Sequence, residues 1–161
     1  MRDETKKKIW TYVIAIALPL FVGALSALLT RKNMNIYEEI NTPPLSPPGI
    51  LFPIVWSILY VLMGISSAAV WLQKDGTKTA PARGLTFYAI SLAFNFVWSI
   101  IFFNARAYLV AFLWLVALLL LIILTMVWYA RVKKWTAVLQ IPYLLWVTFA
   151  GYLNLAIVIL N

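Results

Sequence analysis

Aromatic rings and carboxamides are the side chains of this sequence best suited to bind or transform a ligand. Trp, Tyr and Phe make up 16% of the 161 residues, whereas Cys and His are absent. Without Cys and His there are no thiol nucleophiles, disulfides, haem ligands of the usual kind or zinc sites built from nitrogen and sulfur ligands. Any chemistry must come from rings, amides, the backbone or the ligand itself, and no metal site is expected.

Three groups of these side chains recur at helical spacing. They are Trp56, Tyr60 and Gly64; Asn95, Trp98, Ser99 and Phe102; and Trp146, Ala150, Leu153 and Asn154. Steps of three or four residues place the members of one group on one face of a helix. Spacing alone leaves two interpretations open. The faces either pack a bundle, with small residues and amides joining the helices, or line a pocket whose rings and few polar groups hold a small molecule.

Long apolar runs must position these groups. Of all residues 64% are hydrophobic and 11% charged, whereas soluble domains have roughly 45–50% apolar and 25% charged residues. The runs cover residues 9–30, 50–72, 85–103, 108–129 and 135–160. A bilayer core of about 30 Å needs about 20 apolar residues per helix. The sequence therefore predicts an all-α membrane protein, a bundle of five transmembrane helices that forms one domain over residues 1–161.

Two features at the ends of the runs bear on this interpretation. The tryptophans at those ends, expected to anchor in the headgroup zone, are Trp10, Trp71, Trp128 and Trp135. The first run also fits a cleaved signal peptide, because a basic segment precedes it and Ala24 and Ser26 are small. Its length exceeds the roughly 7–15 residues of a signal-peptide core, which favours a membrane-spanning helix.

The loops predict an orientation. Ten of the basic residues lie before the first run and in loops 73–83 and 130–134, and only three lie on the other side. The positive-inside rule then places the N-terminus in the cytoplasm. Because the basic residues form no continuous face, the net charge of +8 reflects topology and not nucleic-acid binding. Loop 31–48 is rich in proline, which cannot continue a regular helix, and is expected to be an ordered or lid-like loop.

No Asp, Glu, Lys or Arg lies inside the apolar runs. Charged residues at membrane depth usually mark ion paths and proton relays, so an ion-coupled pump is disfavoured. The same absence removes the paired carboxylates, and the nucleophile with its base, that hydrolytic and acid–base enzymes need. The sequence contains no conventional catalytic constellation.

Several separated motifs occur together over nearly the whole chain. They are Tyr37 before the proline loop, Pro43-x-x-x-Pro47-Pro48, Trp56-x-x-x-Tyr60-x-x-Met63-Gly64, Asn95-x-x-Trp98-Ser99-x-x-Phe102-Phe103, Ala105-Arg106 and Pro142-Tyr143-x-x-Trp146-x-x-x-Ala150-x-x-Leu153-Asn154. In these motifs the sequence resembles the tryptophan-rich sensory protein and translocator protein family (TspO/MBR, the peripheral benzodiazepine receptor family). The resemblance implies a bundle of five helices, usually dimeric, with a ligand cavity that opens towards the first loop.

The resemblance also implies the ligands and the residues that bind them. The ligands are porphyrins such as protoporphyrin IX and other flat hydrophobic molecules, including benzodiazepine-type and isoquinoline drugs, and no cofactor is required. The family's cavity lining falls on Tyr37, Pro47, Trp56, Tyr60, Asn95, Trp98, Phe102, Trp146, Ala150 and Leu153. Leu45 stands where the family often has a Trp, and Leu155 follows Asn154 where its proposed cholesterol segment has a Tyr. Sterol binding by that segment is therefore not expected.

Three functions remain open. The leading one is a membrane receptor or sensor for porphyrins, because stacking on indole needs neither a metal nor a charge. The second is a light-dependent enzyme that degrades protoporphyrin IX, with Trp56 and Trp146 as redox-active rings, as the resemblance suggests. The third is a porphyrin or lipid transporter, which uncharged spans without a repeat do not favour.

Location and assembly complete the expectations. Asp3 and Glu4 make the N-terminus unlike an acid-poor transit peptide, which favours a bacterial cell membrane. The resemblance implies a homodimer in the lipid bilayer. Ala89 and Ala93 have the spacing that lets helices approach closely, and they mark a candidate interface.

Overall fold

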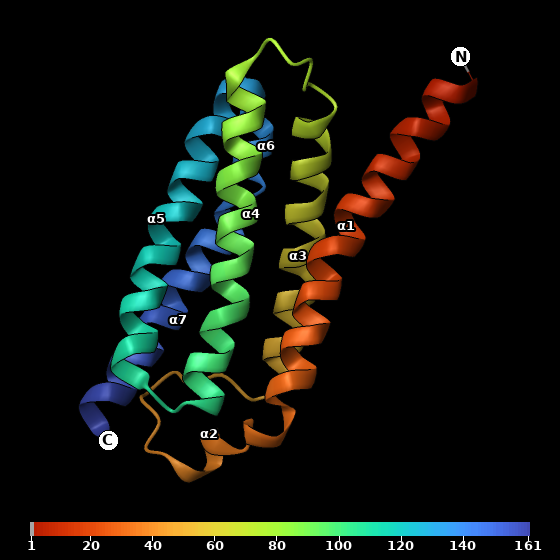
Figure 1. The fold of residues 1–161 in the computed structure, drawn as a ribbon. Helices are drawn as coiled ribbons and strands as arrows, with labels where there is room; N and C mark the ends of the chain where they lie inside the picture. The colour runs from red at the N-terminus through yellow and green to blue at the C-terminus, as the bar shows by residue number, and fades with distance from the viewer. Residues whose placement is uncertain (1) are drawn as a thin grey trace.

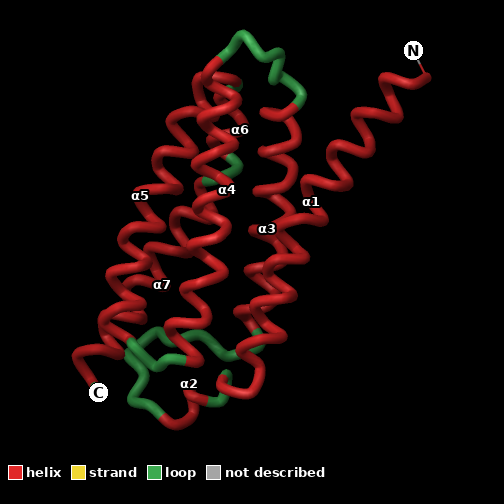
Figure 2. The backbone as a smooth tube through the Cα atoms, viewed as in Figure 1, coloured by secondary structure: helices red, strands yellow, loops and turns green. Residues whose placement is uncertain are grey.

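The computed structural model describes residues 2–161. Its long helices run side by side (Figure 1). The long helices are α1 (Arg2–Thr30), α3 (Leu51–Trp71), α4 (Thr79–Ser99), α5 (Tyr108–Val132) and α7 (Ile141–Leu160). Five helical segments are long and apolar enough to cross a membrane. Figure 2 shows that loops lie mainly at the two ends of the bundle and that the described residues form no strand. The predicted all-α fold with five spans is confirmed.

Two helices begin earlier than the apolar runs predicted. α1 begins at Arg2 with Asp3 and Glu4 in its first turn, where acidic side chains interact favourably with the helix dipole. α4 begins at Thr79 with Pro81 in its first turn, a position that tolerates proline. Polar residues therefore continue both helices beyond the apolar stretch that sequence hydropathy detects.

The last predicted span, residues 135–160, is two helices. α6 covers Lys134–Val138 and α7 begins at Ile141. Pro142 lies in the first turn of α7; because it has no N–H it cannot bond to the carbonyl of Val138, and the helix is interrupted at Leu139 and Gln140. The break leaves the Gln140 side chain free to bond across the bundle, and its Nε2 donates to Ser66 Oγ at 3.2 Å.

The loop between α1 and α3 crosses the end of the bundle opposite the N-terminus (Figure 1). It contains a 3-10 turn (Arg31–Asn33) and the short helix α2 (Ile36–Glu39) before the prolines. Several contacts hold it. Tyr152 donates from its hydroxyl to Pro44 O at 3.1 Å, Asn41 N donates to Asn161 Oδ1 at 3.0 Å, and Glu39 pairs with Arg106 at 3.6 Å. These contacts join the loop to α7 and to the segment that follows α4.

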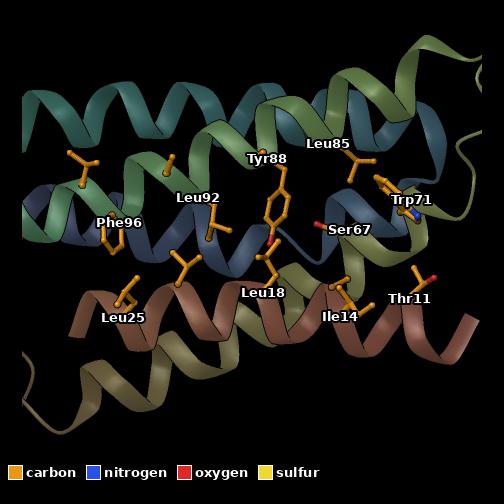
Figure 3. Close-up of a pocket in the computed structure, with 15 residues that line it drawn as sticks. Thr11, Ile14, Leu18, Leu25, Ser67, Trp71, Leu85, Tyr88, Leu92 and Phe96 are labelled. Carbon is orange, nitrogen blue, oxygen red and sulfur yellow. The ribbon is translucent and has the colours of Figure 1, made fainter. Parts of the chain in front are cut away.

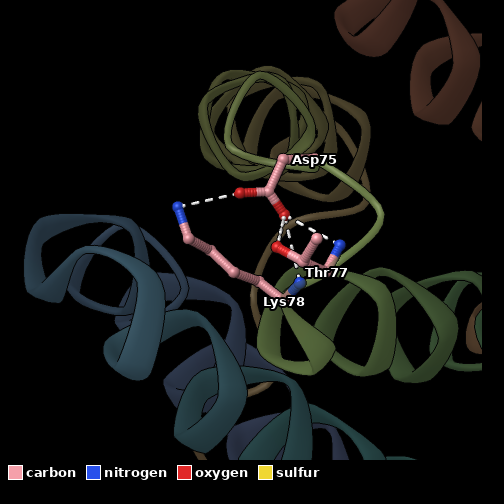
Figure 4. Close-up of polar contacts among 3 residues, drawn as sticks. All are labelled: Asp75, Thr77 and Lys78. Carbon is pink, nitrogen blue, oxygen red and sulfur yellow. Dashed lines mark hydrogen bonds and ion pairs between the residues drawn. The ribbon is translucent and has the colours of Figure 1, made fainter.

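The opposite end closes with the tight loop between α3 and α4 (Figure 4). One oxygen of the Asp75 carboxylate accepts from Thr77 N and Thr77 Oγ1 at 3.0 and 2.8 Å and from Lys78 N at 3.0 Å. The other oxygen pairs with Lys78 Nζ at 3.0 Å. The Thr77 hydroxyl, followed by Lys78, holds the pKa of Asp75 well below its ordinary value.

The span-end tryptophans lie at the surface. Trp10, Trp71 and Trp135 are exposed. Trp128 is partly buried, and the guanidinium groups of Arg83 and Arg131 lie 4.9 and 4.3 Å from its ring. Exposed indoles at helix ends suit the headgroup zone of a bilayer.

Candidate functional site

A cavity of about 1010 Å³ lies beneath the long loop, at the end of the bundle opposite the N-terminus. Its walls come from α1, α3, α4 and α7, and the loop covers it. The ten residues predicted to bind a ligand all line it: Tyr37, Pro47, Trp56, Tyr60, Asn95, Trp98, Phe102, Trp146, Ala150 and Leu153. The fold thus brings three helix faces and two loop residues to one space. Ligand binding by these residues stays a prediction.

The inner end of the cavity is formed by Trp56, Tyr60 and Asn95. The rings of Trp56 and Tyr60 stack with centroids 5.5 Å apart, as their positions one helical turn apart allow. Asn95 Nδ2 donates to the Tyr60 hydroxyl at 3.4 Å, a long and therefore weak bond. Because both groups lie on the cavity wall, they offer a flat ligand one ring surface and a small polar contact.

A second wall joins α4 to α7 through polar groups. Trp98 Nε1 donates to Asn154 Oδ1 at 3.3 Å, and Asn154 Nδ2 donates to Tyr108 O at 2.8 Å. Asn154 therefore satisfies a buried indole and fixes its orientation. Beyond Trp98, α4 continues as a π-helical turn over Ile100–Asn104, a feature frequent at functional sites. This turn carries Phe102, whose ring lies 5.3 Å from that of Trp98.

The cover of the cavity is aromatic. The Tyr37 ring on α2 lies 5.5 Å from Phe52 and 6.1 Å from Phe102. Burial raises the pKa of Tyr37 to about 12, so its phenol stays neutral at any physiological pH. Phe52 in turn contacts Trp146 edge-on at 5.9 Å. Leu45 is 81% exposed and does not line the cavity.

Sequence reasoning missed the contribution of α1. Its cavity-lining residues are Leu20, Gly23, Ala24, Ser26, Ala27 and Thr30. A side chain at Gly23 would overlap the Tyr60 ring, so Gly23 makes room for that ring. The run of small residues in an otherwise bulky apolar segment was the available signal. Two of its members, Ala24 and Ser26, instead suggested a signal-peptide cleavage site.

The chemistry available in the cavity is that of rings and neutral polar groups. Glu38 is the one charged residue among the described residues that line it. In residues 2–161 no group of three or more Asp or Glu side chains is placed to hold a metal ion. The arrangement suits a large apolar ligand held by stacking, with orientation supplied by Asn95 and Tyr60.

Comparisons with known proteins match this chain over most of its length. The model of the TspO/MBR family matches residues 15–160. The tryptophan-rich protein TspO of Chlorobaculum tepidum is 39% identical over 156 residues, which are 96% of this chain and 98% of that protein. The tryptophan-rich sensory protein of Cereibacter sphaeroides is 34% identical, covering 94% and 89% of the two chains. The human translocator protein is 32% identical, covering 89% and 83%.

Proposed function

Because this chain belongs to the TspO/MBR family, we propose that it is a membrane receptor for porphyrins and similar flat hydrophobic molecules. Protoporphyrin IX is the proposed ligand, and no cofactor takes part. One observation carries the proposal: a single cavity of about 1010 Å³ is lined by rings from three helices and a loop. Typical small-molecule pockets span about 300–1,000 Å³, so this one suits a ligand as large as a tetrapyrrole.

Each part of the cavity has a role in binding. Trp56 and Trp146 offer ring faces for stacking, and the Asn95 carboxamide supplies a donor for a ligand oxygen or nitrogen. Tyr37 contributes a neutral ring to the cover, so this side chain repels neither an anionic nor a neutral ligand. Binding by stacking then needs no charge inside the membrane, where charge is costly.

Light-dependent degradation of protoporphyrin IX is the second candidate. The observation that favours it is that Trp56 and Trp146 both line the cavity, so an excited porphyrin bound there would lie close to two oxidisable indoles. Trp146→Phe keeps an apolar ring and removes the more easily oxidised indole. A sharp loss of light-driven porphyrin decay with a modest loss of affinity, against an unchanged Trp135→Phe control, supports this activity. Equal decay in both variants contradicts it.

The receptor is tested by Ala150→Leu with Ala156→Leu as its control. Both residues lie on α7, but only Ala150 lines the cavity. Bulk added at Ala150 enters empty space, so protoporphyrin IX affinity should fall about tenfold while the melting temperature stays nearly constant. In a close-packed core the same change costs about 1–3 kcal/mol. Tryptophan-fluorescence titrations and melting curves measure both. Unchanged affinity with a large loss of melting temperature would show that this face is structural.

The finer location is also proposed. The chain is an integral membrane protein, and we infer a bacterial cell membrane with the N-terminus in the cytoplasm, from the distribution of basic residues. A unique Cys at Gly76, in the loop between α3 and α4, tests this orientation because the chain has no native Cys. Reaction with an impermeant reagent in intact cells contradicts it.

A homodimer is proposed as well, on family membership. Crosslinking in native membranes tests it, and capture of monomer alone contradicts it. Ala89 and Ala93 are exposed on α4, as a contact between two copies would require. Ala89 and Ala93 also line a groove within one chain. A ligand in that groove could contact these two residues in place of a second copy.

A further inference from the structure

A second cavity lies outside the site described above and shares no lining residue with it. It is a groove of about 780 Å³ between α1 and α4, with α3 as its floor (Figure 3). Its lining residues are Thr11, Ile14, Ala15, Leu18, Val22, Leu25, Ser67, Trp71, Leu85, Tyr88, Ala89, Leu92, Ala93, Phe96 and Val97. None of these side chains is charged. The groove arises where α1 diverges from α4 towards the N-terminus (Figure 1).

The groove is long enough to hold a lipid acyl chain along its whole length. Along α1 it extends from Thr11 to Leu25, roughly 21 Å at 1.5 Å per residue. Its outer end is marked by the exposed ring of Trp71, which suits the headgroup zone. Half of a hydrocarbon core is about 15 Å thick. The groove is longer than that, so it runs from the headgroup zone past the middle of the membrane.

One polar group in this apolar groove lacks a partner. The Tyr88 side chain is 6% exposed, and its hydroxyl makes no hydrogen bond. Figure 3 shows Tyr88 reaching across from α4 towards Leu18 of α1. The Ser67 hydroxyl on the groove floor is already bonded to Tyr129 at 2.8 Å. An unpaired hydroxyl in hydrocarbon costs free energy, so the groove offers a donor to a ligand that brings an acceptor oxygen.

The Lys74 side chain places a positive charge at the outer end of the groove. The Lys74 ammonium lies 4.9 Å from the centroid of the Trp71 ring. Lys7 and Lys8 precede Thr11 on α1 by about one helical turn. Basic side chains beside a gap between transmembrane helices favour anionic lipid headgroups.

We propose that this groove binds one anionic phospholipid from the leaflet on the N-terminal side. Its acyl chain lies between α1 and α4, an ester carbonyl accepts from the Tyr88 hydroxyl, and its phosphate lies near Lys74. A helix of a second copy fits the groove less well. Its backbone carbonyls are already bonded within the helix, so it would leave Tyr88 unpaired.

The test uses the full chain in lipid nanodiscs and phosphatidylglycerol with a nitroxide on its acyl chain. Electron spin resonance measures the motionally restricted fraction of this lipid. Ala93→Phe places a ring in the groove, and Ala17→Phe is its control, an exposed position on α1 that lines neither cavity. We expect Ala93→Phe to lower the restricted fraction by about one lipid per chain and Ala17→Phe to leave it at the wild-type value. Equal restricted fractions in Ala93→Phe and the wild type overturn the proposal.

Two further variants leave the groove open and test the polar contacts. Tyr88→Phe removes only the hydroxyl and should weaken retention about fivefold, the effect of one hydrogen bond. Lys74→Gln should lower the preference for phosphatidylglycerol over phosphatidylcholine, and Lys7 and Lys8 should retain part of it. Equal retention in Tyr88→Phe and the wild type, or an unchanged headgroup preference in Lys74→Gln, contradicts the assigned contacts.

Crosslinking and porphyrin titration on Ala93→Phe distinguish a lipid in the groove from two other occupants, a second copy of the chain and a porphyrin. A dimer that is lost while lipid retention persists identifies the groove as an interface between copies, and overturns the proposal. A loss of protoporphyrin IX binding would show that the groove belongs to the first site, and overturns it as an independent site. Unchanged porphyrin affinity with loss of the restricted lipid supports it.

Discussion

The two halves of the bundle are packed differently, although the same long helices build both. In the half beneath the long loop, rings surround a cavity, and the Asn95 carboxamide reaches Tyr60 only at a long 3.4 Å. In the half towards the N-terminus two hydroxyl contacts between helices are short. Ser67 and Tyr129 lie 2.8 Å apart and Ser66 Oγ donates to Thr136 O at 2.7 Å. The half beneath the loop encloses space among its rings, whereas the other half joins α3 to α5 and α6 by short hydroxyl contacts and leaves its groove between α1 and α4.

The two halves of α3 show the same difference in side-chain size. Its first half carries Trp56 and Tyr60, whose rings border the cavity. Its second half is a buried run of small residues from Ser66 to Ala69. Small side chains let helices approach closely in a membrane, where no hydrophobic effect drives them together. A single helix therefore changes from a cavity wall to a packing element within its length.

The largest effect is expected from Gly64→Ala, in the packed half. A methyl group there would lie 2.5 Å from Ile16 Cα and 2.6 Å from Ala15 O. These are backbone atoms of α1, so a change of side-chain rotamer cannot relieve the overlap. We expect a loss of about 3 kcal/mol of stability, the upper end for overpacking. Gly151→Ala is the control, because no atom lies within 4 Å of the added carbon. Chemical denaturation in detergent measures both, and equal stabilities would contradict close packing at Gly64.

A smaller loss is expected from Ser67→Ala. The change leaves the buried Tyr129 hydroxyl without its partner on α3 and should cost about 1 kcal/mol. Ser57→Ala is the matched control on the same helix, since Ser57 is exposed and donates only to its own backbone at Pro53 O. A Ser67→Ala variant as stable as Ser57→Ala would show that the short bond does not stabilise this half.

Gly23→Ala tests the same kind of change in the cavity half. The added methyl meets the end of the Tyr60 ring instead of backbone, and that ring can move into the cavity. Stability should fall by no more than about 0.5 kcal/mol, because the better helix propensity of Ala offsets the contact. Protoporphyrin IX affinity should fall about tenfold, measured by fluorescence titration. A large stability loss with unchanged affinity would show that Tyr60 cannot move.

The sequence was sufficient to predict those features that depend on the length of apolar runs and on helical spacing. The five spans follow from apolar runs, and the faces of Trp56, Asn95 and Trp146 follow from helical spacing. The run of small residues around Gly23 is visible in the sequence, but its role could not be assigned, because a small residue in an apolar run looks the same whether it faces lipid, a helix or a cavity. The groove beside Tyr88 depends on the angle at which α1 leaves the bundle, which no local pattern specifies.

The smallest effect is expected at the loop that closes the packed half, where Asp75→Asn removes an exposed charge. The Thr77 hydroxyl, followed by Lys78, lowers the pKa of Asp75 in the folded protein. A lowered folded-state pKa contributes stability above the unfolded value of about 3.9, and this contribution is lost as the pH falls towards the folded-state value. The melting temperature of Asp75→Asn should therefore lie slightly below that of the wild type at pH 7, and the difference should shrink below about pH 4.

Lys78→Gln removes the ion pair but keeps both backbone N–H donors to Asp75, so it should show a smaller difference, as solvent screens an exposed pair. A gap between Asp75→Asn and the wild type that stays constant down to pH 3 would show that loop geometry, not the carboxylate charge, sets the stability of this end.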